Sequence, residues 1–180
     1  MGTRTLVLVR HGQYDTNDGG RLTALGREQA GVTARFLSRL RPDAVWASTL
    51  PRARETAAIL CADLDGAPRI RHSRFLCEGM YTKIDGYDLT PEDREADRAR
   101  ADRAFAMLFK KSRRDRTELV VCHGNLIRYL VCLAMDVPWA RWTRLTSHHC
   151  AITRVLVRDS GTVRLCSYNE TGHLPESLLT

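Results

Sequence analysis

The fold class follows from Leu6-Val7-Leu8-Val9-Arg10-His11-Gly12, an apolar run that ends in a cation, an imidazole and a glycine. Such a run, rich in β-branched residues, is typical of a short buried strand. Open α/β sheets bind ligands at the carboxyl ends of their strands. There a neutral His11 can act as a nucleophile, Arg10 can hold a phosphate by two hydrogen bonds, and Gly12 lets the backbone approach an anion. Taken alone, the tripeptide Arg10-His11-Gly12 fits two interpretations equally well: a phosphate site, or a strand end that carries ordinary polar residues.

A second His-Gly pair follows another apolar run. Glu118-Leu119-Val120-Val121-Cys122 has the same buried-strand pattern, and it continues into His123-Gly124-Asn125 and an apolar helical stretch over 126–133. Because parallel strands end at the same edge of a sheet, both imidazoles are expected to lie there. The alternative is two unrelated structural histidines, which the matched contexts disfavour.

Strand and helix patterns alternate along the chain and predict one domain over residues 1–180. The expected strands are 4–10, 43–47, 69–72, 117–122, 150–157 and 163–168. The expected helices run from Thr23 as N-cap to about 40, from 51 to 63, from 91 to about 111, and from the second His-Gly pair to about 135. The turn signal Asp159-Ser160-Gly161 makes the last two strands a hairpin. This order predicts an α/β fold whose mostly parallel central sheet has an antiparallel edge strand.

Apolar spacing predicts which helix faces are buried. In the first helix the apolar residues at helical spacing are Leu25, Val32, Phe36, Leu37 and Leu40. In the helix from residue 91, the expected core face consists of Ala101, Phe105, Leu108 and Phe109, and the expected solvent face of Glu92, Glu95 and Arg98. Residues 76–90 are expected to form a loop.

The composition is that of a globular domain with a basic surface. Of the 180 residues, 43% are apolar and 27% are charged, and the formal charge is +7. A basic balance suits a phosphorylated substrate, and because no groove-reading motif is present we expect no nucleic-acid partner. No apolar run approaches the roughly 20 residues of a membrane helix, and no signal peptide opens the chain. We therefore expect a cytoplasmic protein that does not bind membranes.

The six cysteines predict reduced, mostly buried thiols, since none forms a C-x-x-C pair. Cys77 and Cys122 neighbour candidate site residues, so oxidation sensitivity of either thiol is left open. His148-His149 would suit a metal ion, but no carboxylate or thiol at ligand spacing accompanies the pair. We expect neither a metal nor a cofactor.

Three further blocks stand in order between the two His-Gly motifs, at residues 22–30, 48–57 and 76–79. The whole set resembles the histidine phosphatase superfamily, in its phosphoglycerate-mutase-like branch. The resemblance implies a three-layer αβα sandwich and metal-independent phosphoryl chemistry. By the family's motifs, Arg52 in the second of these blocks is catalytic, and Glu78 is the acidic proton donor.

Within this branch the chain is most similar to the mitochondrial serine/threonine protein phosphatases. The likeness lies in residues 10–14, 122–129 and 170–175. Those proteins carry Ser and Ala where this chain has Gly12 and Gly124, and they have an amino-terminal membrane anchor that this sequence does not show. Their middle segment is longer than 79–100. These departures bear on substrate and location more than on chemistry.

The chemistry assigned to the site is hydrolysis of a phosphate monoester through a phosphohistidine. His11, in its neutral form, attacks phosphorus while Arg10 and Arg52 hold the phosphate oxygens. His123 adds a third positive group if it is cationic. Glu78 donates a proton to the leaving oxygen and later accepts one from water, so its pKa should be raised.

Other residues are assigned to substrate binding. The N–H groups of Gly124 and Asn125 open a helix and favour an anion. Asn17 lies where this branch places an Asn in the pocket, and its alternative is a turn residue. Arg21, with Tyr14, is expected to line the entrance. The remaining histidines match no family motif and are expected to be ordinary core or surface residues; they are His72, His148, His149 and His173.

Short connecting segments favour an open site. Only residues 17–22 stand where sugar-phosphate mutases of this branch carry a longer loop. Together with the basic charge, this predicts a phosphatase that acts on phosphoserine or phosphothreonine in proteins. Phosphohistidine proteins and small phosphate esters remain alternatives, followed by a mutase and a non-catalytic phosphate-binding protein. A homo-oligomer is left open, and so is whether residues 172–180 cover the pocket or join a neighbouring subunit.

Overall fold

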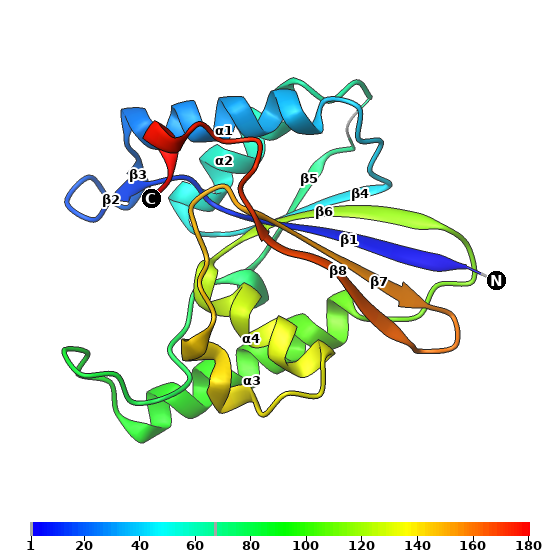
Figure 1. Cartoon of the computed structure of the whole chain (residues 1–180). Helices are drawn as coiled ribbons and strands as arrows, with labels where there is room; N and C mark the ends of the chain where they lie inside the picture. Colours follow the sequence, from blue (N-terminus) through cyan, green and yellow to red (C-terminus); the bar gives the residue numbers. More distant parts are fainter. Residues whose placement is uncertain (1, 67) are drawn as a thin grey trace.

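The computed structural model describes residues 2–66 and 68–180, and in this part of the chain a six-stranded sheet lies between two helical layers (Figure 1). The strands stand in the order β5 (Ile70–Ser73), β4 (Ala44–Ser48), β6 (Arg116–Cys122), β1 (Thr3–Arg10), β7 (Ile152–Arg158) and β8 (Val163–Glu170). One face is covered by α1 (Ala24–Leu37) and α2 (Pro51–Ala62), and the other by α3 (Pro91–Leu108) and α4 (Gly124–Ala134). The predicted three-layer αβα sandwich is confirmed.

Strands β5, β4, β6 and β1 run parallel to one another, and β7 runs antiparallel to β1. The edge strand β8 pairs antiparallel with β7 and so runs in the same direction as β1. The mostly parallel sheet is therefore confirmed, with one strand, β7, opposed to the others and placed next to the edge. The predicted turn at residues 159–161 joins β7 to β8 as a hairpin. Gly161 in this turn has a φ of 94°, in the left-handed region that favours glycine.

The side chains of β1 alternate between two apolar layers. Leu6 and Leu8 pack with residues of α3 and α4, whereas Val7 and Val9 pack with residues of α1 and α2. Both faces of the central strands are covered, and this is why their sequences read as continuous apolar runs. Burying one such side chain stabilises the fold by about 1.5–3 kcal/mol. The strand that ends in Arg10 is therefore firmly held.

Helix α1 buries Leu37 of the predicted apolar stripe, but the rest of its buried face consists of small and polar residues. Thr23 caps the helix as expected, because its side chain accepts a hydrogen bond from an N–H in the first turn. Phe36, expected in the core, is 48% exposed, and its ring stacks on His173 with centroids 4.8 Å apart. Small side chains on the buried face of α1 let this helix approach α2 closely. The larger side chains of α1 lie to either side of this contact. The buried residues are Gly26, Gln29, Ala30, Thr33, Ala34 and Leu37.

Helix α3 ends at Leu108, earlier than the predicted end near residue 111. Ala101 and Leu108 are buried as expected. Arg98, expected in solvent, lies with its guanidinium over the Trp139 ring at 4.8 Å. This cation–π contact attaches α3 to the segment that follows α4.

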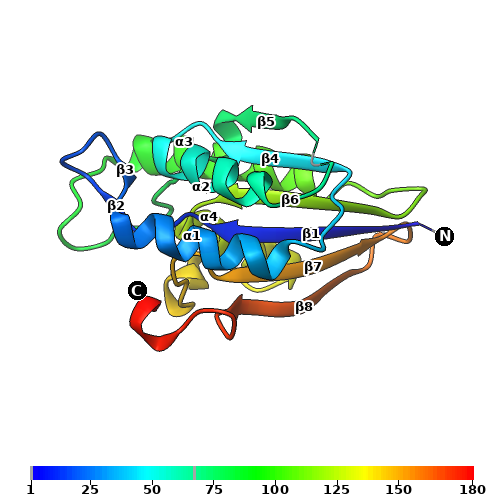
Figure 2. The same cartoon turned by 90° about the horizontal axis from the view of Figure 1, so that it is seen from above.

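Short elements that the sequence patterns do not predict complete the fold. Strands β2 (Tyr14–Asp15) and β3 (Arg21–Leu22) form a two-stranded hairpin, and the short segments of 3-10 helix are η1 (Arg74–Leu76), η2 (Trp139–Arg144) and η3 (Glu176–Leu178). The last segment of the chain returns past α1 toward the end of the sheet where β2 and β3 lie (Figure 2). Among the described helices, none has the length and apolar character needed to cross a membrane.

Candidate active site

The register of the sheet brings His11 and His123 together. Strands β1 and β6 are parallel neighbours with Arg10 opposite Cys122, so the histidines that follow them leave the sheet side by side. The His11 N–H donates to the Cys122 carbonyl at 3.0 Å, and the two imidazole centroids lie 4.9 Å apart. Both rings are fully buried. The structure thus brings the two imidazoles together at one sheet edge, as the sequence predicts.

The His11 ring is held in the tautomer that a nucleophile needs. Its Nδ1 lies 2.7 Å from the Gly12 carbonyl oxygen, which can only accept, so Nδ1 carries the proton. Nε2 is left with a lone pair, which accepts a hydrogen bond from Arg52 Nε at 3.1 Å. Burial lowers the pKa of His11 well below its ordinary value, and His123, Arg10 and Arg52 lower it further. His11 is therefore neutral near pH 7 in the free site.

Arg52 reaches His11 from the first turn of α2. Pro51 opens this helix, where its fixed φ and missing N–H are tolerated. The Arg52 guanidinium lies over the Tyr14 ring at 4.2 Å, and the same ring meets His11 edge-on with centroids 5.2 Å apart. Tyr14, expected at the entrance, thus forms a wall of the site and orients Arg52.

Ser48, at the end of β4, contacts the second imidazole. Its Oγ lies 2.8 Å from His123 Nε2, while His123 Nδ1 is buried, has no hydrogen-bond partner among the described residues and lies 3.8 Å from Glu78 Oε2. Burial lowers the pKa of His123 well below its ordinary value, and Arg52 and Arg10 act in the same direction. In the free site His123 is therefore neutral, and only a bound anion that raises its pKa could make it the third cation.

Glu78 faces His123 from the loop that follows η1. Its Oε1 accepts a hydrogen bond from the Asn125 N–H at 3.1 Å, at the amino-terminal end of α4. Burial raises the pKa of Glu78, and the opposing effect of Arg10 and Arg52 offsets this only in part. A carboxyl group with a raised pKa can donate a proton near neutral pH, as the assigned role requires.

Two glycines and one backbone amide serve different contacts from those expected. A Cβ on Gly12 would lie 2.4 Å from the Gly26 carbonyl oxygen, so Gly12 permits the approach of α1 to the end of β1 rather than that of an anion. A Cβ on Gly124 would lie 3.2 Å from Arg10 Nε, so Gly124 makes room for that side chain. The Asn125 N–H, expected to bind substrate, is occupied by the Glu78 carboxylate in the free site.

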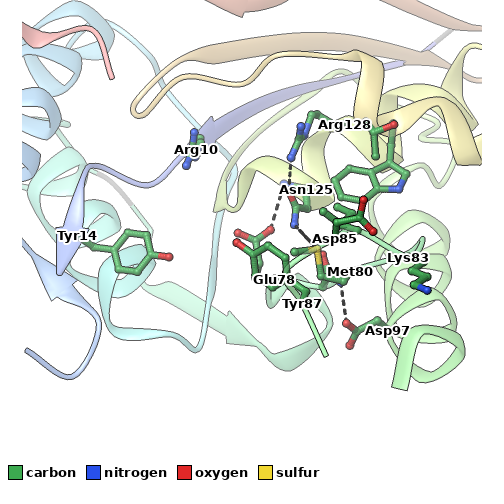
Figure 3. A pocket seen from close by; sticks show the side chains of 14 residues that line it. Arg10, Tyr14, Glu78, Met80, Lys83, Asp85, Tyr87, Asp97, Asn125 and Arg128 are labelled. Carbon is green, nitrogen blue, oxygen red and sulfur yellow. Dashed lines mark hydrogen bonds between the residues drawn. The ribbon is translucent and has the colours of Figure 1, made fainter. Parts of the chain in front are cut away.

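A pocket of about 860 Å³ opens from this cluster (Figure 3). Arg10, Tyr14 and Glu78 line it together with Asn125 and Arg128 of α4. The Asn125 side chain accepts a hydrogen bond from Arg128 and donates one to the carbonyl of the residue after Glu78. The pocket extends past a phosphate-sized volume, and the residues that line this extension include Met80, Lys83, Ile84, Tyr87 and Trp142.

Asn17 and Arg21 are exposed on the hairpin formed by β2 and β3 and are not among the residues that line this pocket. The Asn17 N–H donates to Asp15 Oδ1 at 2.8 Å, and the Gly20 N–H donates to the Asp15 carbonyl at 3.0 Å. The loop is thus closed on itself, which is the turn role weighed as the alternative for Asn17. The structure does not bring these two predicted substrate-binding residues into the pocket.

His149 is a site residue that the sequence motifs do not reveal. Its Nε2 lies 3.0 Å from Arg10 Nη2, and its ring centroid lies 5.6 Å from that of His11. It reaches the site because β7 pairs with β1, and the Arg10 N–H donates to the Ala151 carbonyl at 3.2 Å. The sequence pattern of a hairpin from residue 150 indicates that His149 precedes a strand. It places His149 beside Arg10 only once β7 is known to pair with β1. The expectation of an ordinary structural role for His149 is therefore revised.

Both cysteines beside the site have surroundings that set their reactivity. Burial raises the pKa of Cys122 to about 12, so this residue is a thiol and a poor candidate for oxidation. Cys77 is partly exposed, and its Sγ lies 3.1 Å from Thr49 Oγ1 and 3.5 Å from Ser48 Oγ. Through Ser48 it is one contact away from His123.

The ligand atoms of His11, His123 and Glu78 lie within 4.8 Å of one another, a spacing that a metal ion could use. Arg10 and Arg52 act electrostatically on all three of these groups. Two guanidinium charges disfavour a cation at this point and favour an anion. The arrangement is suited to a phosphoryl group.

Comparisons with known proteins agree with this geometry. The family model of the histidine phosphatase superfamily (branch 1) matches residues 6–100 and 85–171. The serine/threonine-protein phosphatase Pgam5, mitochondrial, of Drosophila persimilis is 35% identical over 192 residues, which cover 98% of this chain and 66% of that protein. The chain thus spans just under two thirds of this relative's length.

Solved structures show the same fold. Phosphoglycerate mutase from Plasmodium falciparum is 28% identical with a TM-score of 0.70, covering 98% of this chain and 96% of that one. Phosphoserine phosphatase from Entamoeba histolytica, solved in complex with phosphoserine, is 20% identical with a TM-score of 0.75, covering 96% and 100%.

The predicted cytoplasmic location is wrong on this comparison, because the Drosophila relative is named as a mitochondrial protein. That prediction depended on the lack of a recognisable targeting segment, and a chain that spans 66% of its relative carries no information on such a segment. The motif order, the fold and the paired imidazoles all agree with the family match. The chain belongs to the histidine phosphatase superfamily, branch 1.

Proposed function

We propose that this protein is a phosphatase that hydrolyses phosphate monoesters through a phosphohistidine on His11. One observation carries the proposal. The His11 ring is neutral, its proton is held on Nδ1 by the Gly12 carbonyl, and its Nε2 lone pair meets the guanidinium of Arg52. A nucleophile and a cation that meet in this way in a buried site are suited to attack on a bound phosphoryl group.

In the first step the His11 Nε2 lone pair forms a bond to phosphorus while the ester P–O bond breaks. The substrate oxygens replace Nε2 as acceptor of the Arg52 hydrogen bond, and Arg10 holds the same phosphoryl group. Glu78, protonated at the start, transfers its proton to the departing oxygen, so the alcohol leaves neutral. The negative charge of the phosphate raises the pKa of His123, whose Nδ1–H then donates to a phosphate oxygen.

In the second step water attacks the phosphohistidine. The Glu78 carboxylate takes a proton from the water, the new P–O bond forms and the P–N bond breaks. Inorganic phosphate leaves, His11 regains its lone pair and Glu78 its proton. Because the arginines and His123 supply the positive charge around phosphorus, the cycle needs no metal ion.

We infer further that the substrates are proteins phosphorylated on serine or threonine. The Pgam5 relative is named for this activity. The pocket of about 860 Å³ has room beyond the phosphate, with apolar and aromatic side chains of Met80, Ile84, Tyr87 and Trp142 along it. This lining suits the residues next to a phosphorylated side chain. Phosphohistidine proteins and small phosphate esters are the alternatives.

The first test compares wild type with His11→Ala on 4-nitrophenyl phosphate. Wild type is expected to hydrolyse the ester and, after rapid acid quench, to show the mass of one added phosphoryl group. His11→Ala should lose both the activity and the mass increase, whereas His72→Ala, on the exposed strand β5, should keep both. Full activity of His11→Ala would disprove the nucleophile assignment.

A substrate panel then separates the alternatives. Phosphoserine and phosphothreonine peptides, a phosphohistidine protein and 3-phosphoglycerate are compared by kcat/KM under the same conditions. We expect the phosphopeptides to be hydrolysed most efficiently. Turnover of 3-phosphoglycerate alone would refute the inference of protein substrates while leaving the phosphohistidine mechanism intact.

A further inference from the structure

We propose that His149 is a positioning residue, which holds the Arg10 guanidinium ready for the phosphate and is itself held by Thr180 at the far end of the chain. The inference rests on the proposed function, because it takes Arg10 as a phosphate ligand. It concerns a residue that matches none of the family motifs and that lies in a loop far from Arg10 in sequence.

The direction of each hydrogen bond in this network follows from the chemistry of the groups. Arginine has only N–H donors, so His149 Nε2, 3.0 Å from Arg10 Nη2, must be the acceptor. The proton of a neutral His149 is then on Nδ1, which donates to Thr180 Oγ1 at 2.8 Å. The Thr180 oxygen also accepts from Gln29 Nε2 at 2.8 Å. The Arg10 contact permits one direction only and so selects the His149 tautomer that is protonated on Nδ1, and Thr180 Oγ1 is the acceptor for that proton.

Gln29 anchors this network in the core. It is fully buried in α1, its Nε2 also donates to the Leu178 carbonyl at 2.8 Å, and its Oε1 accepts the Gln13 N–H at 2.8 Å. The backbone completes the attachment, since the His149 N–H donates to the Thr180 carbonyl at 3.0 Å. The segment 174–180 therefore has a defined place beside the site, in contact with α1 and with the loop that carries His149.

Arg10 needs such support. Its Nη1 donates to the Ser147 carbonyl, its Nη2 to His149, and its Nε is buried without a hydrogen-bond partner among the described residues. Glu78 is the carboxylate with the largest electrostatic effect on Arg10. Without His149 the guanidinium would be drawn toward that carboxylate, which would weaken phosphate binding and would also favour the ionised form of Glu78.

Burial, and then the adjacent Arg10, lower the pKa of His149 to about 4, which agrees with a ring that stays neutral in this network. The other neighbouring titratable groups are His148 and Arg52, and both act in the same direction. His149 therefore serves as a hydrogen-bond acceptor, and the inference gives it no proton to transfer in the reaction.

The test uses variants of the full chain. His149→Phe keeps an aromatic ring and removes the acceptor, and His149→Gln places an amide oxygen where it can accept from Arg10. Thr180→Val removes the hydroxyl that accepts the hydrogen bond from His149 Nδ1. His148→Phe is the matched control, because its ring contacts Asn169 Nδ2 at 2.8 Å and has no contact with Arg10. Steady-state kinetics on 4-nitrophenyl phosphate, inhibition by inorganic phosphate, and thermal unfolding are measured for each.

We expect His149→Phe to lower kcat/KM about 10- to 100-fold, as for a lost hydrogen bond to a charged group, and to weaken phosphate inhibition in parallel. His149→Gln should recover most of both. Thr180→Val should show a smaller loss in the same direction, and His148→Phe should keep wild-type kinetics. A purely structural role would instead lower the unfolding temperature, equally in the Phe and Gln variants, without a specific effect on phosphate.

The inference is overturned if folded His149→Phe has wild-type kcat/KM and phosphate inhibition, or if Gln is no better than Phe. If His149→Phe does not fold, Thr180→Val decides the outcome. Wild-type kcat/KM together with unchanged phosphate inhibition in Thr180→Val overturns the inference, and a loss in either supports it. Failure of the proposed function looks different, because wild type itself would then form no phosphoenzyme.

Discussion

At the residue scale, the site depends on two groups whose protonation differs from that of the same groups in water. His11 is kept neutral by burial and by nearby positive charge, and Glu78 is shifted toward its protonated form by burial. Near neutral pH the site can therefore hold an unprotonated nucleophile, His11, and a protonated acid, Glu78, at the same time. Both shifts come mainly from removal of water, so they belong to the folded state alone.

The role of Glu78 predicts a dependence on the leaving group. Glu78→Gln should lower the rate of phosphoenzyme formation from a phosphoserine peptide by about 10²- to 10⁴-fold, because the serine oxygen needs a proton to depart. The loss should be much smaller for 4-nitrophenyl phosphate, whose leaving group is stable as an anion. In wild type the peptide reaction should slow as pH rises through the raised Glu78 pKa, and Glu78→Gln should lack this limb.

Glu55→Gln is the control for this series, because Glu55 pairs with Arg27 on the surface at 3.5 Å. It should keep wild-type kinetics on both substrates. Equal losses of Glu78→Gln in the rate of phosphoenzyme formation from the two substrates would mean that Glu78 does not protonate the leaving oxygen, whereas a loss in phosphoenzyme hydrolysis is common to both substrates because it comes from the second step.

At the element scale, the position of the nucleophile depends on a contact between β1 and α1 that only glycine permits. The Gly12 backbone lies against Gly26, and a Cβ at Gly26 would lie 2.0 Å from the Gln13 carbonyl oxygen. The two elements therefore approach each other by backbone, directly beside His11.

Gly12→Ala should destabilise the fold by about 1–3 kcal/mol, as overpacking of a filled space does, and should lower activity because the His11 backbone must shift. Gly31→Ala, in the middle of the same helix α1, has its nearest contact at 3.8 Å and should stabilise the fold by about 0.5–1 kcal/mol. Denaturant unfolding and kcat measure both effects. A Gly12→Ala variant as stable and active as wild type would contradict the contact described.

At the scale of the whole molecule, three neutral histidines couple stability to pH, of which His11 and His123 are fully buried and His149 is half-buried. The pKa values of His11, His123 and His149 are all lowered in the folded protein. In the unfolded chain these rings bind protons near pH 6.5, so acidification favours unfolding. Glu78 acts in the opposite sense: its raised pKa costs stability at high pH, and this cost disappears as pH falls. One carboxyl group offsets only part of the effect of three imidazoles.

We therefore expect the unfolding temperature to fall as pH is lowered from about 7.5 to about 5.5, across the range where unfolded histidine takes up protons. Inorganic phosphate should reduce this fall, because a bound anion stabilises the protonated imidazoles. Thermal unfolding at several pH values, with and without phosphate, checks this. An unfolding temperature that is constant over this range would show that the histidines are not buried in neutral form.

Residue patterns alone were sufficient for the elements with strong local signals. The runs before His11 and His123 are covered by helices on both faces, and such burial leaves a continuous apolar pattern. Thr23 and Pro51 mark helix starts through local hydrogen bonding and a fixed φ. The family motifs pointed to Arg52 and Glu78, and the structure places both beside the imidazoles.

The sequence by itself determined the alternation of strands and helices and the two histidines that follow buried strands, because these depend on neighbours within a few residues. Only the tertiary structure decided that Asn17 and Arg21 stay on an exposed hairpin, that Gly12 packs against α1, and that His149 holds Arg10. The contact of His149 with Arg10 joins residues 139 positions apart and depends on which strand lies beside β1. The approach of Gly12 to Gly26 and the exposure of the hairpin depend on how α1 packs against the end of β1. Local chain patterns do not encode packing of this kind.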